Sequence, residues 1–264
     1  MDKTILRGKT ALITGASSGL GVDFARQLAE LGCNLILVAR REDRLREVER
    51  EVASQSGVAV TVIPLDLGEV DAAQRLYDEV KAQGKTVDVL INNAGFGVHG
   101  EFVTVPWVRE QEMLALDIMT VVHLTKLFVP DMLARNFGYI LQVASTAAYQ
   151  PVPSYATYGA AKSFVLNFGE ALHYELRKTN VHCTILSPGV TATEFFQVSG
   201  QRLTLFQRLT MLDSTTVAKI GLAGMLAGKP SVIAGFVNTL LVWSNRFAPR
   251  TVSTAVGHHL MTMP

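Results

Sequence analysis

The sequence predicts a doubly wound α/β fold, in which a parallel sheet of about seven strands is covered by helices on both faces. Short, continuously apolar runs alternate along the chain with amphipathic stretches at helical spacing. Continuous apolar runs are typical of parallel strands, because such strands are buried on both sides. No linker or low-complexity segment interrupts the alternation. We therefore expect residues 1–264 to form a single domain.

The expected elements follow one another in strand–helix order. The strands are predicted at 10–15, 34–40, 59–67, 87–95, 138–145, 181–189 and 231–234. The helices are predicted at 21–32, 41–57, 71–84, 109–136, 154–178 and 215–227, each with apolar residues on one face. Pro130 lies inside the fourth helix, and we expect it to bend or locally break that helix.

The alternation loosens after Gly189. Residues 190–214 make an unusually long connection for a compact domain, which predicts a substrate lid. Its large apolar residues favour an apolar substrate, although they could equally serve only to pack the lid on the body. These residues are Phe195, Phe196, Leu203, Leu205 and Phe206. Residues 215–264 are expected to complete the domain with a helix, a strand and an apolar tail.

The amino-acid composition indicates which kinds of partner and which cellular compartment to expect. Charged residues make up 18% of the chain, below the ~25% typical of soluble domains, so much surface should lie in the core or in an oligomer interface. The net charge of +1 gives no reason to expect a nucleic acid. Cys33 and Cys183 lie in apolar surroundings and indicate a reduced, cytoplasmic protein.

Membrane insertion is not expected from the sequence. The polar first residues show no signal peptide, and no apolar run reaches the ~20 residues of a membrane span. The nearest case is the segment 232–243, which Asn238 interrupts. A peripheral membrane enzyme that uses this C-terminal segment remains an alternative reading.

The first predicted strand ends in the glycine-rich turn TGASSGLG, residues 14–21. Its glycines are Gly15, Gly19 and Gly21, and a helix follows at once. Backbone N–H groups of such a turn, together with the helix N-terminus, can hold a pyrophosphate, and a Cβ would keep the phosphate away from the backbone. The alternative is an ordinary tight turn between a strand and a helix.

The end of the second strand bears on the choice of cofactor. Enzymes that use NAD place a carboxylate here for the ribose 2′-hydroxyl, whereas this chain has Arg40 and Arg41, with Glu42 and Asp43 only at the start of the next helix. A guanidinium favours a 2′-phosphate, so Arg40 favours NADP(H) over NAD(H). The alternative is that Arg40 is a solvated charge at the helix start.

Tyr158 and Lys162 are candidates for acid–base chemistry. They are four residues apart and would share one face of the helix 154–178, whereas Tyr155 lies two turns before the lysine. A nearby ammonium favours the phenolate and would lower the pKa of Tyr158. Taken alone, this pair could also be a surface tyrosine and lysine.

The chain resembles the short-chain dehydrogenase/reductase family, and most of all its broad bacterial, NADP-dependent branch. The glycine-rich turn, NNAG at 92–95, Ser145, YGAAK at 158–162 and PGVTAT at 188–193 occur in the order and spacing of that family. The resemblance covers residues 8–195 and, more weakly, the remainder. It implies a Rossmann-type fold and the reduction of a carbonyl, or the oxidation of an alcohol, with NADP(H).

The resemblance also implies roles for individual residues. Tyr158 would be the proton donor or base, Lys162 would tune it and bind the nicotinamide ribose, and Ser145 would hold the substrate carbonyl. The positions expected to contact the cofactor are Thr14, Gly15, Ser17, Ser18, Gly19, Leu20, Gly21, Arg40, Asp66, Leu67, Asn93, Ala94, Gly95, Tyr158, Lys162, Pro188, Gly189 and Thr193.

One position departs from the family pattern. Many members carry an asparagine in the long helix, where it holds a relay water next to the lysine, and this chain has Asp117 there. The sequence thus predicts an oxidoreductase, with a regulatory protein that binds the cofactor without turnover as the alternative. The histidines show no metal-site spacing, so we expect no metal.

Surplus apolar positions indicate self-association. The helices at 109–135 and 155–178 carry more apolar residues than one buried stripe needs, and in relatives these helices pair across a twofold axis. The positions concerned are Phe164, Phe168, Leu172, Leu116, Val121 and Leu127. We expect a homodimer or homotetramer, with a small carbonyl or alcohol as the only other partner.

Overall fold

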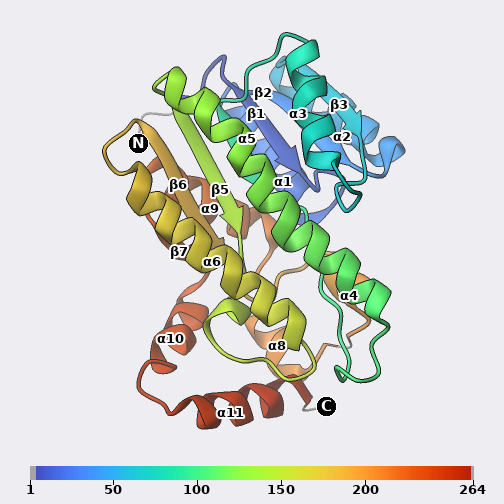
Figure 1. Ribbon diagram of the computed structural model, residues 1–264, viewed down its shortest axis with the longest axis vertical. Coiled ribbons are helices and arrows are strands. Elements are labelled where there is room, and N and C mark those ends of the chain that lie inside the picture. The colour runs from blue at the N-terminus through green and yellow to red at the C-terminus, as the bar shows by residue number, and fades with distance from the viewer. Residues whose placement is uncertain (1–3, 202, 263–264) are drawn as a thin grey trace.

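The computed structural model describes residues 4–201 and 203–262 and contains one seven-stranded sheet (Figure 1). All neighbouring strands are parallel, in the order β3-β2-β1-β4-β5-β6-β7. The strands are β1 (Thr10–Thr14), β2 (Asn34–Ala39), β3 (Val60–Pro64), β4 (Val89–Asn92), β5 (Gly138–Val143), β6 (Val181–Ser187) and β7 (Ser231–Ile233). The predicted doubly wound fold is confirmed.

Two layers of helices bury the two faces of the sheet. Alternate residues of β1 face different layers: Ile13 packs in the core beneath α1 (Gly19–Glu30), α2 (Glu42–Ser56) and α9 (Ser214–Leu226). Leu12 packs in the opposite core, beneath α3 (Ala72–Ala82), α5 (Val121–Ala134) and the end of α6 (Ala156–Leu176). Burial on both faces explains why the strands are continuously apolar.

The strand order creates the crevice in which a ligand can bind. From β1 the chain moves outward to β2 and β3, and then returns to place β4 on the other side of β1, with Ala11 opposite Val89. The connections after β1 and β4 therefore leave the sheet in opposite directions, and a crevice opens between them at the carboxyl ends of the strands.

The long fourth helix is irregular, but not at the predicted place. It runs as α4 (Trp107–Leu114), a π-helical turn η1 (Ala115–Thr120) and α5, and α5 continues through Pro130 without interruption. The prediction of a break at Pro130 was therefore wrong. Phe128 and Met132, on either side of the proline, are buried in the core and hold the helix together.

The same run is the only described helix that is long and apolar enough to cross a membrane by length and composition. It covers one face of the sheet, where Leu124 and Phe128 are buried. A layer of the fold cannot also be surrounded by lipid, so we assign this helix to the core.

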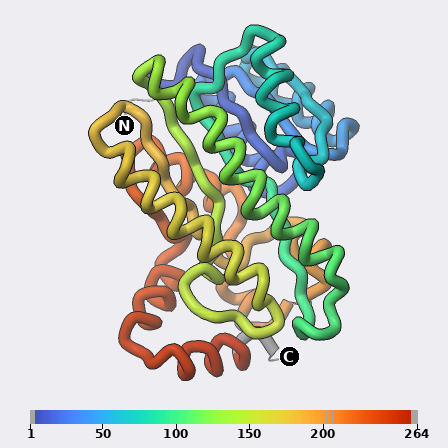
Figure 2. The backbone as a smooth tube through the Cα atoms, in the orientation of Figure 1, coloured from blue at the N-terminus to red at the C-terminus, as the bar shows by residue number. Residues whose placement is uncertain are grey.

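Beyond the sheet, the chain builds the lower end of the molecule (Figure 2). The lid segment (residues 190–214) contains α7 (Phe195–Ser199) and α8 (Leu205–Thr210), the second of which begins at a capping box formed by Thr204 and Gln207. The expected apolar tail forms α10 (Phe236–Ser244) and α11 (Arg250–Thr262).

Candidate active site

Ser145, Tyr158 and Lys162 meet at the carboxyl end of the sheet. Ser145 follows β5 and caps the 3-10 turn η2 (Thr146–Tyr149), where its Oγ accepts a hydrogen bond from the Ala147 N–H at 3.1 Å. Tyr158 and Lys162 lie one turn apart near the start of α6, and the Lys162 Nζ is 5.7 Å from the centre of the Tyr158 ring. The Ser145 hydroxyl lies close enough to the Tyr158 phenol to lower its pKa. The predicted trio is therefore assembled.

Burial dominates the acidity of the Tyr158 phenol. It raises the pKa of Tyr158, against the opposing effects of the Lys162 ammonium and the Ser145 hydroxyl, and the Asp117 carboxylate adds to the rise. The lysine lowers the pKa as expected, but burial outweighs it and the net shift is upward. Tyr158 is thus held as the neutral phenol, which is the form that can donate a proton.

Asp117 forms a buried ion pair with the lysine. The π-helical turn η1 carries Asp117, whose Oδ2 lies 2.9 Å from the Lys162 Nζ while its Oδ1 accepts from the Phe96 N–H at 3.1 Å. Burial has the largest single effect and would lower the pKa of Lys162, but the Asp117 carboxylate and the Tyr158 phenol together outweigh it and the pKa is raised. Burial also raises the pKa of Asp117, against the opposing effect of the Lys162 ammonium. Gly95 leaves room for the pair, because a Cβ there would lie 2.8 Å from the Asp117 Oδ1.

The second tyrosine of the helix belongs to the lid contact. Tyr155 is buried, and its hydroxyl donates to the Gln201 Oε1 at 2.9 Å and lies 3.0 Å from the Ser199 Oγ. Burial raises the pKa of Tyr155 to about 12. A phenol with this pKa and these partners ties the lid segment to α6 and is a poor acid or base at neutral pH.

The lid segment covers the candidate trio with an aromatic side chain. The Phe195 ring lies 5.4 Å from the Tyr158 ring and 5.5 Å from the Phe196 ring. A Cβ added to Gly97 would meet the Phe195 ring at 2.7 Å, so the loop after β4 closes on the same ring. The space beside Tyr158 is therefore apolar on the lid side. The side chain of Phe206 lies outside the described residues.

The glycine-rich turn is shaped to receive a phosphate. Gly15 and Gly19 have φ values of +68° and +51°, which favour glycine, and a Cβ on Gly21 would lie 2.1 Å from the Gly15 carbonyl oxygen. Ser18 is the N-cap residue of α1, but its side chain does not cap the helix. The Gly21 N–H donates to the Ser18 carbonyl at 3.2 Å, and no side chain caps the start of α1, so the turn and this helix N-terminus fit a dinucleotide pyrophosphate.

The side chains of Thr14 and Asn93 link the ends of β1 and β4, which form the frame of the crevice. The Thr14 hydroxyl donates to the Ile91 carbonyl at 3.3 Å and accepts from the Ala94 N–H at 2.9 Å. The Asn93 side chain donates to the Thr14 carbonyl at 2.9 Å. The Thr14 side chain is thus engaged within the frame, and the expected contact of Thr14 with the cofactor stays a prediction. Leu20 also packs partly against the core.

The end of β2 carries two arginines with different partners. The Arg40 side chain is 74% exposed, with its Nη1 3.6 Å from the Asp66 Oδ2, so its guanidinium can turn toward a ligand. Arg41 instead lies 2.9 Å from Glu194 of the lid segment and 3.3 Å from the Ser17 Oγ. Sequence reasoning assigned no role to Arg41, and its partner Glu194 is too distant in the chain to give any signal.

The remaining expected cofactor positions border the crevice. The Asp66 Oδ1 accepts from the Gly68 N–H at 3.0 Å, and the buried Leu67 accepts from the Thr120 hydroxyl through its carbonyl. A Cβ on Gly19 would lie 2.8 Å from the Thr193 Cγ2, so Thr193 touches the glycine-rich turn.

The turn after β6 is held by two distant segments. The Pro188 carbonyl accepts from the Thr146 N–H at 2.8 Å. Asn238 of α10 is buried against Gly189, where a Cβ would lie 2.3 Å from the Asn238 Nδ2. The sequence predicted Pro188 and Gly189 but not Asn238, which we had treated only as an interruption of an apolar run.

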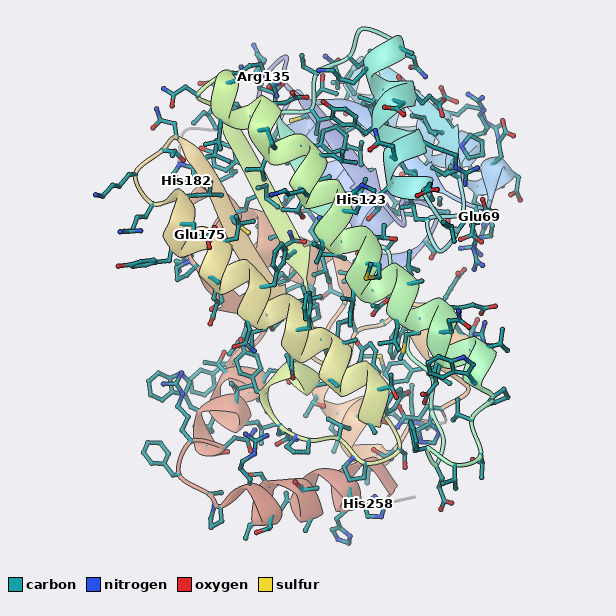
Figure 3. All side chains as sticks on the ribbon, viewed as in Figure 1. Glu69, His123, Arg135, Glu175, His182 and His258 are labelled. Carbon is teal, nitrogen blue, oxygen red and sulfur yellow. The ribbon has the colours of Figure 1, made fainter. Side chains whose placement is uncertain are left out.

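The three histidines labelled in Figure 3 lie on different elements. His123 is on α5, His182 on β6 and His258 on α11, at separate places along the molecule. Among residues 4–201 and 203–262, no group of three or more His, Cys, Asp or Glu side chains could hold a metal ion.

Comparison with known proteins agrees with this geometry. A model of the short chain dehydrogenase family matches residues 9–203. The very-long-chain 3-oxoacyl-CoA reductase of Anas platyrhynchos is 33% identical over 198 residues, which cover 73% of this chain and 62% of that protein. The chain spans about three fifths of the length of the curated relatives it matches.

Solved structures extend the similarity over most of the chain. A short-chain dehydrogenase from Sphingobium yanoikuyae in complex with NADPH is 26% identical, with a TM-score of 0.81 over 90% of this chain and 93% of that one. A metagenomic short-chain oxidoreductase in complex with NADP is 28% identical, with a TM-score of 0.72 over 86% and 97%. Other curated relatives come from insects, a fungus and mammals, so the expectation of a bacterial branch is supported only in part.

Proposed function

Because the chain belongs to the short-chain dehydrogenase/reductase family, we propose that it transfers a hydride between NADP(H) and a carbonyl or secondary alcohol. The observation that carries the proposal is the meeting of Ser145, Tyr158 and Lys162 beside a glycine-rich turn that fits a pyrophosphate. The alternative, a regulatory protein without turnover, has no specific observation in its favour, since all three side chains are in place.

The chain's own residues supply binding, orientation and the proton. NADPH provides the hydride when it is bound. Gly15 and the N-terminus of α1 would hold its pyrophosphate, and Arg40 and Arg41 would hold the 2′-phosphate. Pro188 to Thr193 would border the nicotinamide. The named NADPH and NADP complexes of the two solved relatives support this choice of cofactor.

Tyr158 would act as the general acid in carbonyl reduction. The Ser145 hydroxyl would donate to the substrate oxygen and fix it near the phenol, and the neutral Tyr158 would give its proton to that oxygen as negative charge develops. The Lys162 ammonium, itself held by Asp117, would stabilise the phenolate that results. In alcohol oxidation the same phenolate would be the base.

An apolar substrate is part of the proposal. Phe195 of the lid segment packs on the Tyr158 ring, and Tyr155 closes the same region from α6. The name of the Anas platyrhynchos relative points to 3-oxoacyl thioesters as one class to test. Cys33 and Cys183 are free and buried, which supports the proposal of a reducing, cytoplasmic location.

The test is NADPH oxidation with ketones, aldehydes and 3-oxoacyl thioesters, followed by substitution of the acid. Tyr158→Phe should lower kcat by ~10²–10⁴-fold, the usual contribution of a positioned general acid, and leave NADPH affinity nearly unchanged. Tyr155→Phe is the matched control and should keep most of kcat, because it loses only the contacts of its hydroxyl with Ser199 and Gln201 of the lid segment. Tight NADPH binding without turnover of any substrate would favour the regulatory alternative.

A further inference from the structure

One face of the helix α10 is buried against the rest of the protein, and the other face is apolar and exposed. Its Asn238 and Val242 are buried. On the other side, Phe236, Leu240 and Trp243 recur at spacings of four and three, which places them on one face of the helix, and Phe247 follows in the next turn. The four side chains are 83%, 61%, 55% and 83% exposed. We call these four residues the apolar stripe.

The chain segment that carries the apolar stripe has charges of one sign. No aspartate or glutamate occurs after Asp213, whereas Arg246 follows α10 and Arg250 begins α11. The Arg246 guanidinium is 5.2 Å from the Trp243 ring. A tryptophan among large apolar side chains, with arginines next to it in the chain, is the pattern of surfaces that lie in the headgroup region of an anionic bilayer.

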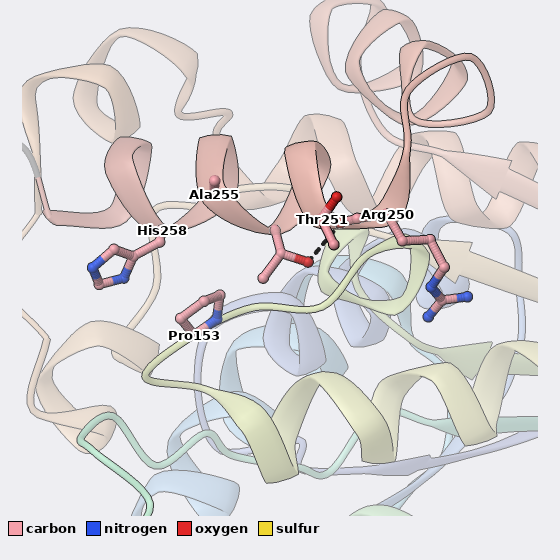
Figure 4. Close-up of a pocket in the computed structure, with 6 residues that line it drawn as sticks. Pro153, Arg250, Thr251, Ala255 and His258 are labelled. Carbon is pink, nitrogen blue, oxygen red and sulfur yellow. Dashed lines mark hydrogen bonds between the residues drawn. The ribbon is translucent and has the colours of Figure 1, made fainter.

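The apolar stripe lies at the end of the molecule where the candidate active site opens. Asn238, on the buried face of α10, packs against Gly189 beside the crevice. Next to the stripe, a pocket lies between α11 and the loop that leads into α6, with Pro153 on one side and Thr251 and His258 on the other (Figure 4).

We propose that the apolar stripe, with Arg246 and Arg250, docks the protein on an anionic lipid bilayer. The nine-residue α10 would lie in the plane of the interface, because a span needs ~20 residues. A second copy of the chain is the poorer occupant, since a twofold contact would bring the same arginines together with no acidic residue from 214 to 264 to neutralise them. The proposal goes beyond the proposed function and does not depend on it.

The test measures vesicle binding of the full chain without cofactor or substrate. The protein should float with vesicles of phosphatidylcholine and phosphatidylserine and much less with phosphatidylcholine alone. Leu240→Ser with Phe247→Ser should lower the partition coefficient by about tenfold or more. Tyr174→Ser with Val70→Ser is the matched control, because these side chains are equally exposed, at 63% and 86%, on other elements.

Two further measurements test how deeply the apolar stripe enters the bilayer and how much the two arginines contribute to binding. The chain has two tryptophans, so in Trp107→Phe all tryptophan fluorescence comes from Trp243. Lipids brominated in the acyl chain should quench this fluorescence. Arg246→Gln with Arg250→Gln should weaken binding to the anionic vesicles by about fivefold per arginine. The matched pair Lys126→Gln and Lys178→Gln should leave that binding nearly unchanged.

Three results would overturn the proposal. The first is no flotation with anionic vesicles, and the second is flotation that the substitutions in the apolar stripe do not weaken. The third is a lipid-free dimer that Leu240→Ser with Phe247→Ser converts to a monomer, which would assign the stripe to a second copy of the chain.

Discussion

The Asp117–Lys162 pair sets the charge around the Tyr158 hydroxyl. Both members are buried, so each is stabilised mainly by the other and by a few fixed groups: Phe96 N–H for the carboxylate and the Val143 carbonyl for the ammonium. Removing one member of a buried pair leaves the other without compensation. A change at Asp117 should therefore act on Tyr158 through charge, without touching the substrate.

We expect Asp117→Asn to move the pH profile of alcohol oxidation toward lower pH. The Asp117 carboxylate raises the pKa of Tyr158, so removing its charge lowers that pKa and the phenolate base forms at lower pH. Neighbouring charges typically shift a pKa by ~1–3 units, and we expect a shift of the profile by about one unit. The measurement is kcat/KM against pH for both proteins, with Asp88→Asn as a control in another buried acid. Superimposable profiles would mean that the charge of Asp117 has no part in the reaction.

Arg40 offers a separate prediction on cofactor choice. Arg40→Asp replaces an exposed guanidinium with an acid that repels a 2′-phosphate. Loss of a charge-assisted contact is worth ~1.5–3 kcal/mol, so the preference for NADPH over NADH should fall by roughly 10- to 150-fold. The measurement is the ratio of kcat/KM with NADPH to kcat/KM with NADH, in the wild type and in Arg40→Asp. Arg46→Asp, on the outer side of α2, is the control, and an equal effect there would refute a specific role for Arg40.

The sequence predicted the candidate catalytic residues better than the contacts that hold them in place. The spacing of Tyr158 and Lys162 is local to one helix, so the pattern predicted their meeting. Arg41 and Glu194 are paired across 153 positions, and Asn238 reaches Gly189 from another helix. Spacing in a sequence carries no information about such contacts, because they depend on how separate elements pack.

At the scale of elements, the turn between β1 and α1 tolerates no added side chain. A Cβ at Gly21 would overlap the Gly15 carbonyl, so Gly21→Ala must displace the turn and should lower NADPH affinity by tenfold or more, about 1.4 kcal/mol. Calorimetric titration of the nucleotide measures this. Gly159→Ala is the control: its Cβ would have ordinary contacts at 3.5 Å or more, and within α6 alanine should stabilise the fold by ~0.5–1 kcal/mol. Unchanged affinity in Gly21→Ala would exclude the turn as the phosphate site.

The sequence pattern gave the sheet in full and the helices in part. Each strand was predicted within a few residues, because burial on both faces makes the strands continuously apolar. The π-helical turn around Asp117 was missed, since one extra residue in a helical turn barely alters the apolar period. The helix α11 was expected only as part of an apolar tail, because an exposed apolar face does not produce the pattern of a buried one.

At the scale of the whole molecule, the surface available for self-association is smaller than the sequence indicated. Val121 is buried, and Leu116, Leu127 and Leu172 pack partly on the core. These four positions were wrongly counted as surplus. Phe164 remains 42% exposed and stacks on Phe168 at 6.0 Å.

We still predict a dimer or tetramer, assembled through the outer face of α6. Phe164→Glu should shift the protein to monomer at micromolar concentration, because a charge cannot be buried in that contact without a partner. Light scattering measures the mass. Val70→Glu, which changes an exposed side chain far from α6, should leave the mass unchanged. A wild-type protein that is monomeric under the same conditions would contradict the prediction.

The strand order has a consequence for the nascent chain on the ribosome. β1, β2 and β3 can pair as soon as they emerge, but β1 keeps an open edge until Val89 arrives to lie beside Ala11. Synthesis adds ~5–20 residues per second, so Asn238 follows Ala94 by on the order of ten seconds. The phosphate cradle can form at the start of that interval, whereas the turn at Gly189 and then the Asn238 side chain that packs on it are synthesised later. The part of the crevice that fits the phosphates can therefore form before the part proposed to border the nicotinamide.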